Sequence, residues 1–139
     1  MQVSEKQKLT FPEGILGFEF IKEYYILDME ESPFYCLQAA TEKEIAFILI
    51  QPDFFMKDYK LVISEFDLTA LDIRNPEEIL DFAIVTIPEN PEEMTANLQG
   101  PVVINKRTRE ARQIISLNDA YTVRHLILPG VREKQSGGG

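Results

Sequence analysis

Short runs of β-branched and aromatic residues recur along this chain at intervals of roughly ten residues, separated by prolines, glycines and acidic residues. This spacing is typical of an antiparallel barrel or sandwich, because strands this short are joined by turns. We therefore predict one all-β, mainly antiparallel, barrel-like domain over residues 1–130, with one or two short helices. Residues 131–139 predict a flexible tail or an added linker. The predicted strands are Leu9–Phe11, Tyr24–Asp28, Phe34–Ala39, Ile45–Ile50, Tyr59–Ile63, Leu80–Ile87 and Tyr121–Leu128.

Two local patterns add a hairpin and a helix to this series. Val102–Asn105 and Arg112–Leu117 flank the polar segment Lys106–Ala111, which predicts two paired strands joined by a longer loop. Ser64–Leu71 begins with a helix-capping residue, and Asp67 follows three positions later. We expect this segment to be a short helix.

The charge balance indicates which partners the chain attracts. Its 23 acidic and 14 basic residues give a formal net charge of −9. Binding to nucleic acid depends on basic residues that displace counterions, so we expect no direct nucleic-acid partner. A basic protein would be attracted instead. The longest apolar run, Ile45–Ile50, is too short for a membrane span, and residues 1–8 contain no signal pattern, so we expect a cytoplasmic protein without membrane contact.

Residues that carry catalytic or metal chemistry are few. Cys36 is the only cysteine and lies in an apolar stretch, where an inert thiol is the usual outcome. His125 is the only histidine, and one histidine without a cysteine pair does not make a zinc site. We expect no metal, no cofactor and no catalytic residue.

Charged residues in the turns leave several interpretations open. Three glutamate pairs, each beside a proline, are either solvated loop charges or together form an acidic contact surface; a hydrolase built on Glu77 and Glu78 is the enzymatic alternative. The basic hairpin segment Lys106–Arg112 either keeps the hairpin tip soluble or contacts an anionic partner, and an RNA-binding barrel is the alternative that uses it. The pairs are Glu30-Glu31, Glu77-Glu78 and Glu92-Glu93.

An apolar segment, Asp53–Met56, contains two adjacent phenylalanines. Neighbouring side chains on a strand face opposite sides, so Phe54 and Phe55 do not both point inward from a simple strand. Either one of them lies in a surface groove that contacts a protein, or a turn or helical kink buries both.

Several motifs together resemble the bacterial flagellar assembly factor family FliW, over roughly residues 8–128. Gly100 departs from the alanine expected before the proline of the fourth motif. The motifs are Phe11–Glu19, Pro33–Gln38, Pro52–Phe55 followed by Tyr59, and Met94–Asn105 followed by Gln113, Tyr121 and Arg124. The resemblance implies scaffold roles for Gly14, Gly17, Asn97, Pro101, Asn105, Gln113, Tyr121 and Arg124.

The resemblance also implies a function. Proteins of this family are small barrel-like cytoplasmic domains that bind newly made flagellin. When free, they bind the RNA-binding repressor CsrA and allosterically relieve its block on flagellin translation. The implied role is therefore regulatory and not enzymatic. For CsrA we predict contacts through the loop acids Asp67, Asp72, Glu77 and Glu78. For the amphipathic helices of flagellin we predict an apolar groove that includes Phe54, Phe55 and Met56.

Overall fold

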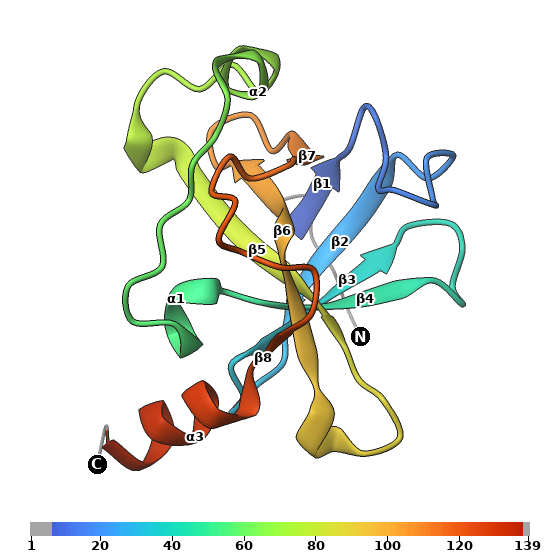
Figure 1. Ribbon diagram of the computed structural model, residues 1–139. Coiled ribbons are helices and arrows are strands. Elements are labelled where there is room, and N and C mark those ends of the chain that lie inside the picture. The colour runs from blue at the N-terminus through green and yellow to red at the C-terminus, as the bar shows by residue number, and fades with distance from the viewer. Residues whose placement is uncertain (1–6, 138–139) are drawn as a thin grey trace.

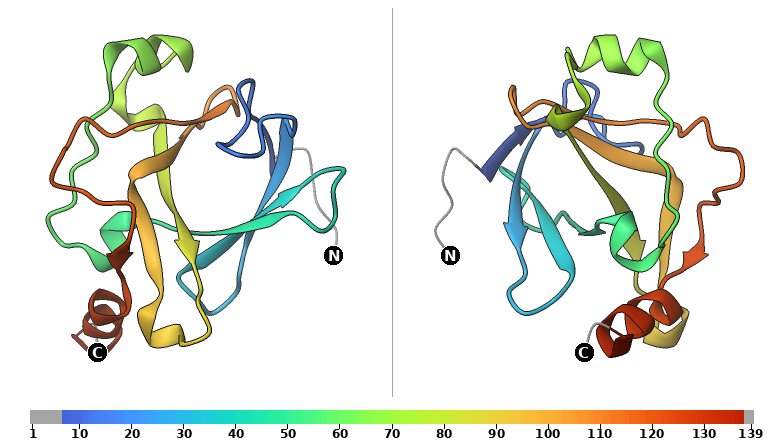
Figure 2. Two further views of the ribbon diagram at one scale, coloured as in Figure 1. Left: turned by 45° about the vertical axis from the view of Figure 1, so that its right-hand side comes forward. Right: turned by 90° about the vertical axis from the view of Figure 1, so that its left-hand side faces the viewer.

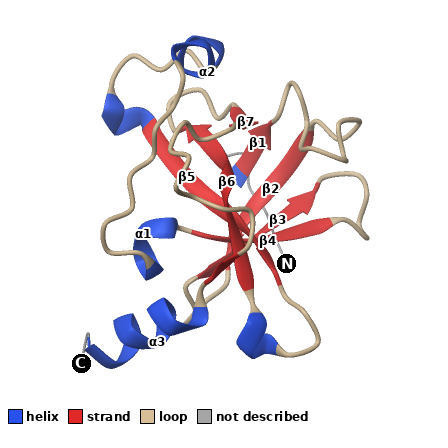
Figure 3. Cartoon of the chain, viewed as in Figure 1, coloured by secondary structure: helices blue, strands red, loops and turns tan. Residues whose placement is uncertain are grey.

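The strands form one antiparallel sheet that rolls into a nearly closed barrel (Figures 1 and 3). The structure is a computed structural model and describes residues 7–137. Strands β1 to β7 neighbour one another in the order of the chain, and β8 pairs with β6. The predicted fold class is confirmed. The strands are β1 (Lys8–Thr10), β2 (Glu23–Asp28), β3 (Phe34–Ala39), β4 (Ala46–Ile50), β5 (Ile79–Thr86), β6 (Thr95–Asn105), β7 (Ala111–Gln113) and β8 (His125–Leu126).

Short helices occupy the connections between the strands. The structure has α1 (Pro52–Phe55), α2 (Glu65–Ala70) and α3 (Leu128–Gly137), and the 3₁₀ turns η2 (Pro76–Glu78) and η3 (Pro91–Glu93). The predicted helix is confirmed as α2, and its cap is Ser64, whose hydroxyl accepts the Asp67 N–H at 3.1 Å. No helix among residues 7–137 has the length and apolar composition needed to cross a bilayer.

The barrel closes at one end only. Thr10, at the end of β1, forms an isolated bridge with Glu110 just before β7, and its N–H donates to the Arg109 carbonyl at 3.1 Å. Figure 2 shows the β1–β2 loop beside β7 at this closing edge. Beyond the bridge, the two edges are no longer joined by a ladder. We call this opening the seam.

Aromatic side chains fill the barrel. The ring centroids of Phe11 and Tyr24 lie 5.1 Å apart, and those of Tyr35 and Phe82 lie 4.9 Å apart, both with edge-to-face geometry. Burial raises the pKa of Tyr24 to about 12, which keeps its hydroxyl neutral. A second apolar cluster lies under α1 and α3 and includes Phe55, Leu98 and Val131.

A wide bulge interrupts the pairing of β5 with β6. Phe82 pairs with Val102 but Ile84 pairs with Asn97, so four residues of β6 stand opposite one residue of β5. This bulge explains why a proline, Pro101, is tolerated inside a central strand, since no ladder bond is required there. The Asn97 side-chain oxygen accepts the N–H of Gln99 at 3.1 Å and of Gly100 at 2.8 Å.

The strand predicted at Tyr59–Ile63 is wrong. Both edges of β4 are already paired, with β3 and with β5, so a further strand finds no free edge there. The segment instead crosses the outside of the barrel as an extended strap. Its side chains Leu61 and Ile63 pack against a small apolar cluster of Leu71, Val103 and Ile114.

The C-terminal segment also differs from the prediction. Only β8 forms from the strand predicted over Tyr121–Leu128, and the chain then enters α3. Pro129 is the second residue of this helix, where the missing N–H has no intrahelical partner to lose. Helix α3 therefore crosses the boundary predicted at residue 130, and Val131 is only 4% exposed.

Candidate partner-binding surfaces

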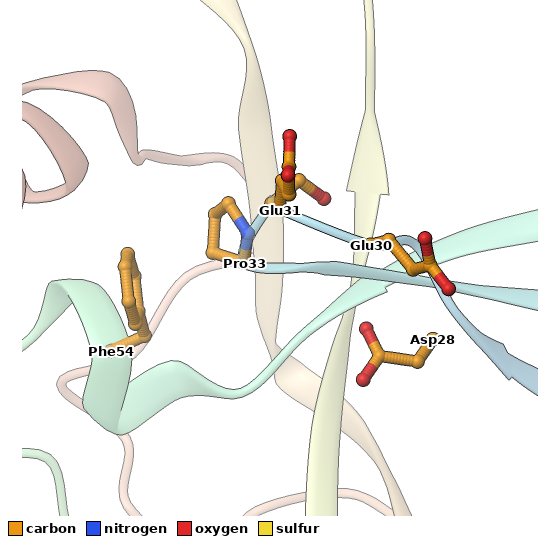
Figure 4. A pocket seen from close by; sticks show the side chains of 6 residues that line it. Asp28, Glu30, Glu31, Pro33 and Phe54 are labelled. Atoms are coloured by element: carbon orange, nitrogen blue, oxygen red, sulfur yellow. The ribbon is translucent and has the colours of Figure 1, made fainter.

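A shallow open depression of about 630 Å³ lies between α1 and the β2–β3 turn. Phe54, on α1, forms one wall, and Pro33 faces it from the turn (Figure 4). Three carboxylates, those of Asp28, Glu30 and Glu31, and the side chain of Ser32 form the rest of the lining. Among residues 7–137, none of these three forms an ion pair. We call this surface the Phe54 depression.

The other two residues predicted to lie with Phe54 do not line the depression, although Phe54 is also half-buried and packs against the second apolar cluster. Phe55 is only 8% exposed, because α1 turns its ring toward β8, 5.8 Å from the ring of His125. Met56 is half-buried and packs against the second apolar cluster. A helical kink therefore separates the two phenylalanines, which leaves Phe54 at the surface and places Phe55 in the interior.

Three of the four acids predicted to contact CsrA bind arginines of this same chain. Asp67 pairs with Arg112 at 2.9 Å. Arg107 reaches Asp72 at 3.0 Å and also pairs with Glu78. These pairs connect α2 and η2 to the β6–β7 hairpin. Glu77 is exposed and forms no ion pair within the described part of the chain.

The same ion pairs engage two arginines of the basic hairpin segment, Arg107 and Arg112. The backbone N–H of Arg74 donates to the Glu78 carboxylate at 2.7 Å, and this bond, followed by that from Arg107, lowers the pKa of Glu78. Carboxylates therefore hold Arg107 and Arg112, two of the four basic side chains of the hairpin. Lys106 and Arg109 are exposed and form no ion pair among residues 7–137, so an RNA contact would depend on these two.

Several residues predicted to be scaffold bind the backbone of other segments through their side chains. Gln113 donates to the Gly100 carbonyl at 3.1 Å and accepts the Leu16 N–H at 3.0 Å, which links β6 to the β1–β2 loop. The hydroxyl of Tyr121 accepts the Lys60 N–H at 2.8 Å. Arg124 is exposed and, among residues 7–137, has no carboxylate partner.

Comparison with known proteins agrees with this architecture. The family model for the FliW protein matches residues 1–127. The chain belongs to the FliW family. A flagellar assembly factor FliW from Leptospira interrogans is 48% identical over 92% of this chain and 87% of the relative. One from Treponema pallidum is 36% identical over 96% and 89%. A crystal structure of the flagellar assembly factor FliW superposes with a TM-score of 0.85 at 31% identity and covers 93% of this chain and 91% of the other.

The single cysteine and histidine of this FliW-family chain are packed into the fold. Burial raises the pKa of the Cys36 thiol, which disfavours the reactive thiolate. His125 is half-buried on β8 beside Phe55. Among the residues described, no group of three or more histidine, cysteine, aspartate or glutamate side chains has metal-binding geometry.

One ionisable residue of this FliW-family chain was missed at the sequence level. Asp81 lies inside the apolar strand β5, under the strap, near Tyr59. Burial raises the pKa of its carboxyl group. The signal in the sequence was a lone acid within the apolar run Leu80–Ile87.

Asp81→Asn is expected to stabilise the protein at pH 7 and to leave its stability unchanged near pH 3. Because the folded-state pKa of Asp81 is raised, the folded form binds this proton more tightly than the unfolded chain does. The ionised carboxyl therefore weakens folding increasingly as the pH rises from the ordinary pKa to the raised one. Urea unfolding at pH 3, 5 and 7 measures the difference. Asp58→Asn, at an exposed position, is the control, and an equal effect of Asp81→Asn at every pH would contradict the prediction.

Proposed function

We propose that this chain is a cytoplasmic flagellar assembly factor that binds flagellin and, when free of flagellin, binds and allosterically antagonises the repressor CsrA. The family membership supports the assembly role. The observation that carries the binding proposal is the Phe54 depression, where an aromatic wall faces three unpaired carboxylates. Such a surface suits an amphipathic helix whose apolar face lies on Phe54 and whose basic residues meet the acids.

The proposed CsrA contact lies at the other end of the barrel, around Asp67, Asp72, Glu77 and Glu78. Internal pairing neutralises three of these acids, so Glu77 is the carboxylate free to meet a basic partner. The net charge of −9 adds a negative potential that weakens the attraction of a bound repressor for RNA without overlap of the two sites.

Phe54→Ala is expected to weaken flagellin binding about tenfold, because a central aromatic anchor dominates such contacts. Titration calorimetry with purified flagellin measures the affinity. Phe66→Ala is the control: this phenylalanine also lies at the surface, but it is on α2 at the opposite end of the barrel. Equal affinities for wild type and Phe54→Ala would remove the Phe54 depression from the proposal, and no binding of wild type to flagellin or to CsrA would refute the function.

The proposed contact with CsrA is tested by the salt dependence of the binding affinity. Wild-type binding to CsrA is expected to weaken as ionic strength rises, since exposed charges are screened. Glu77→Lys should lower the affinity and flatten this dependence, while flagellin binding stays unchanged. A salt dependence that Glu77→Lys does not alter would place the CsrA contact elsewhere.

A further inference from the structure

A second concave surface lies at the seam of the barrel, away from the Phe54 depression. This groove has a volume of about 360 Å³ and lies between the β1–β2 loop and the segment that follows β7. Three exposed apolar side chains line it: Leu16 is 80% exposed, Ile115 65% and Val123 51%. Exposed apolar residues that gather at one hollow indicate a contact site more than scattered ones do. We call it the seam groove.

The backbone beside the seam groove presents a strand edge that is open at Ile115, while two residues further on the Leu117 N–H donates to the Val62 carbonyl at 3.0 Å. The N–H of Ile114 donates to Pro101 at 3.0 Å, and the N–H of Ser116 donates to Gln99 at 2.8 Å. Backbone groups alternate in direction along a strand, so the N–H and C=O of Ile115 point away from β6, toward the seam. Neither group has a hydrogen-bond partner within the described part of the chain.

The polar lining of the groove contains a side-chain hydrogen-bond donor, the Asn97 amide, that has no acceptor in the described part of the chain. The Asn97 side-chain oxygen is engaged at the bulge, but its amide N–H₂ group has no acceptor within residues 7–137. Gly100 leaves open the space next to this amide, since a Cβ there would lie 3.1 Å from the Asn97 nitrogen. The free amide is therefore a donor for the backbone carbonyl of a bound segment.

The charge at the groove is negative. Glu13 and Glu19 line it, and the Gly17 N–H donates to the Glu19 carboxylate at 3.0 Å, which lowers the pKa of Glu19 and keeps it ionised. Within residues 7–137, no lysine or arginine side chain lines the groove. An occupant with a basic residue therefore complements this surface.

We propose that the seam groove binds an extended segment of a partner protein, which adds as a strand to the edge at Ile115. An apolar side chain of the segment lies on Leu16, Ile115 and Val123, and a lysine or arginine meets Glu13 and Glu19. This mode uses main-chain hydrogen bonds for affinity and alternate side chains for specificity. The inference rests on the proposed function only in that the partner is a polypeptide.

Amide hydrogen exchange of Ile115 tests the proposal directly. Without a partner, this N–H is open to solvent, and an added strand would protect it. The probe is an acetylated, amidated Lys-Val-Lys-Val-Lys peptide, added to the full chain in excess and followed by NMR. Slowing of Ile115 exchange by about tenfold or more, with no slowing by the Glu-Val-Glu-Val-Glu peptide, is the expected result. Unchanged exchange, or equal protection by both peptides, would overturn the proposal.

Variants extend the test to whole partners. Ile115→Asp should weaken binding of the lysine peptide about tenfold, and Leu126→Asp, at another exposed apolar position outside the groove, should not.

Flagellin and CsrA are then tested for protection of Ile115. If they bind but neither they nor the peptide protects Ile115, the groove proposal fails and the proposed function stands. If the peptide protects Ile115 while neither protein binds, the groove proposal stands and the proposed function fails. Protection that depends only on the concentration of this chain would assign the groove to a second copy and overturn the proposal.

Discussion

Gly14→Ala is expected to lower the free energy of unfolding by about 3 kcal/mol. Gly14 has a φ of +68°, which costs an alanine energy even in open space. A Cβ at this position would also lie 2.5 Å from the Cα and 2.7 Å from the carbonyl oxygen of Glu19, so backbone would have to move. The β1–β2 loop folds back on itself at this point, and the substitution would open it. Urea unfolding followed by tyrosine fluorescence measures the loss.

Gly17→Ala is the matched control in the same loop. Gly17 also has a positive φ, +89°, but a Cβ there would meet no atom within 4 Å. Only the conformational cost remains, about 1 kcal/mol. Equal losses at the two positions would show that backbone strain, and not the approach of Glu19, decides the effect at Gly14.

Asn105→Leu is expected to cost about 3 kcal/mol of stability. Asn105 is fully buried at the end of β6. Its amide N–H₂ group donates to the Leu71 carbonyl at 2.7 Å, and its oxygen accepts the Arg107 N–H at 2.8 Å. Leucine has a similar size but satisfies none of these groups, so buried donors and acceptors would be left unpaired. The free energy of unfolding from urea titration is the measurement.

Two further variants separate the contributions at Asn105. Asn105→Asp keeps the acceptor for Arg107 and Thr108 but loses the donor to Leu71 and places a buried carboxylate beside that carbonyl, so we expect it to be destabilised on the α2 side. Asn90→Leu removes an exposed asparagine that caps η3 and should cost about 1 kcal/mol. If Asn105→Leu cost no more than Asn90→Leu, the buried hydrogen bonds would not be what holds α2 to the hairpin.

The strands were predictable from the sequence because the pattern of a half-buried strand is local. The prediction at Phe34–Ala39 matches β3 at both ends, and the run at Ile45–Ile50 differs from β4 by one residue. The same reasoning failed at Tyr59–Ile63, where apolar residues cover the barrel from outside without forming a strand ladder. Local composition reports that a side chain will be buried, but it does not say whether a free strand edge is available.

The candidate surfaces were predictable only in part. The adjacency of Phe54 and Phe55 left two arrangements open, and the structure buries Phe55 and leaves the half-buried Phe54 in the wall of the depression. Of the acids predicted to lie in loops, Asp67 is on α2 and Glu78 ends η2, whereas Asp72 lies in the turn after α2. Their arginine partners are 29 to 45 positions away in the sequence, so no local pattern reveals the pairs.

The sequence alone was enough to predict most of the strands, the cap of α2, the acidic charge and the family. The folded barrel decided the rest: which acids remain unpaired, which phenylalanine stays at the surface, and where the sheet stays open. The physical reason is that strand and turn preferences depend on neighbours in the chain. Charge pairing, burial and free backbone edges instead depend on which distant segments the closing sheet brings together.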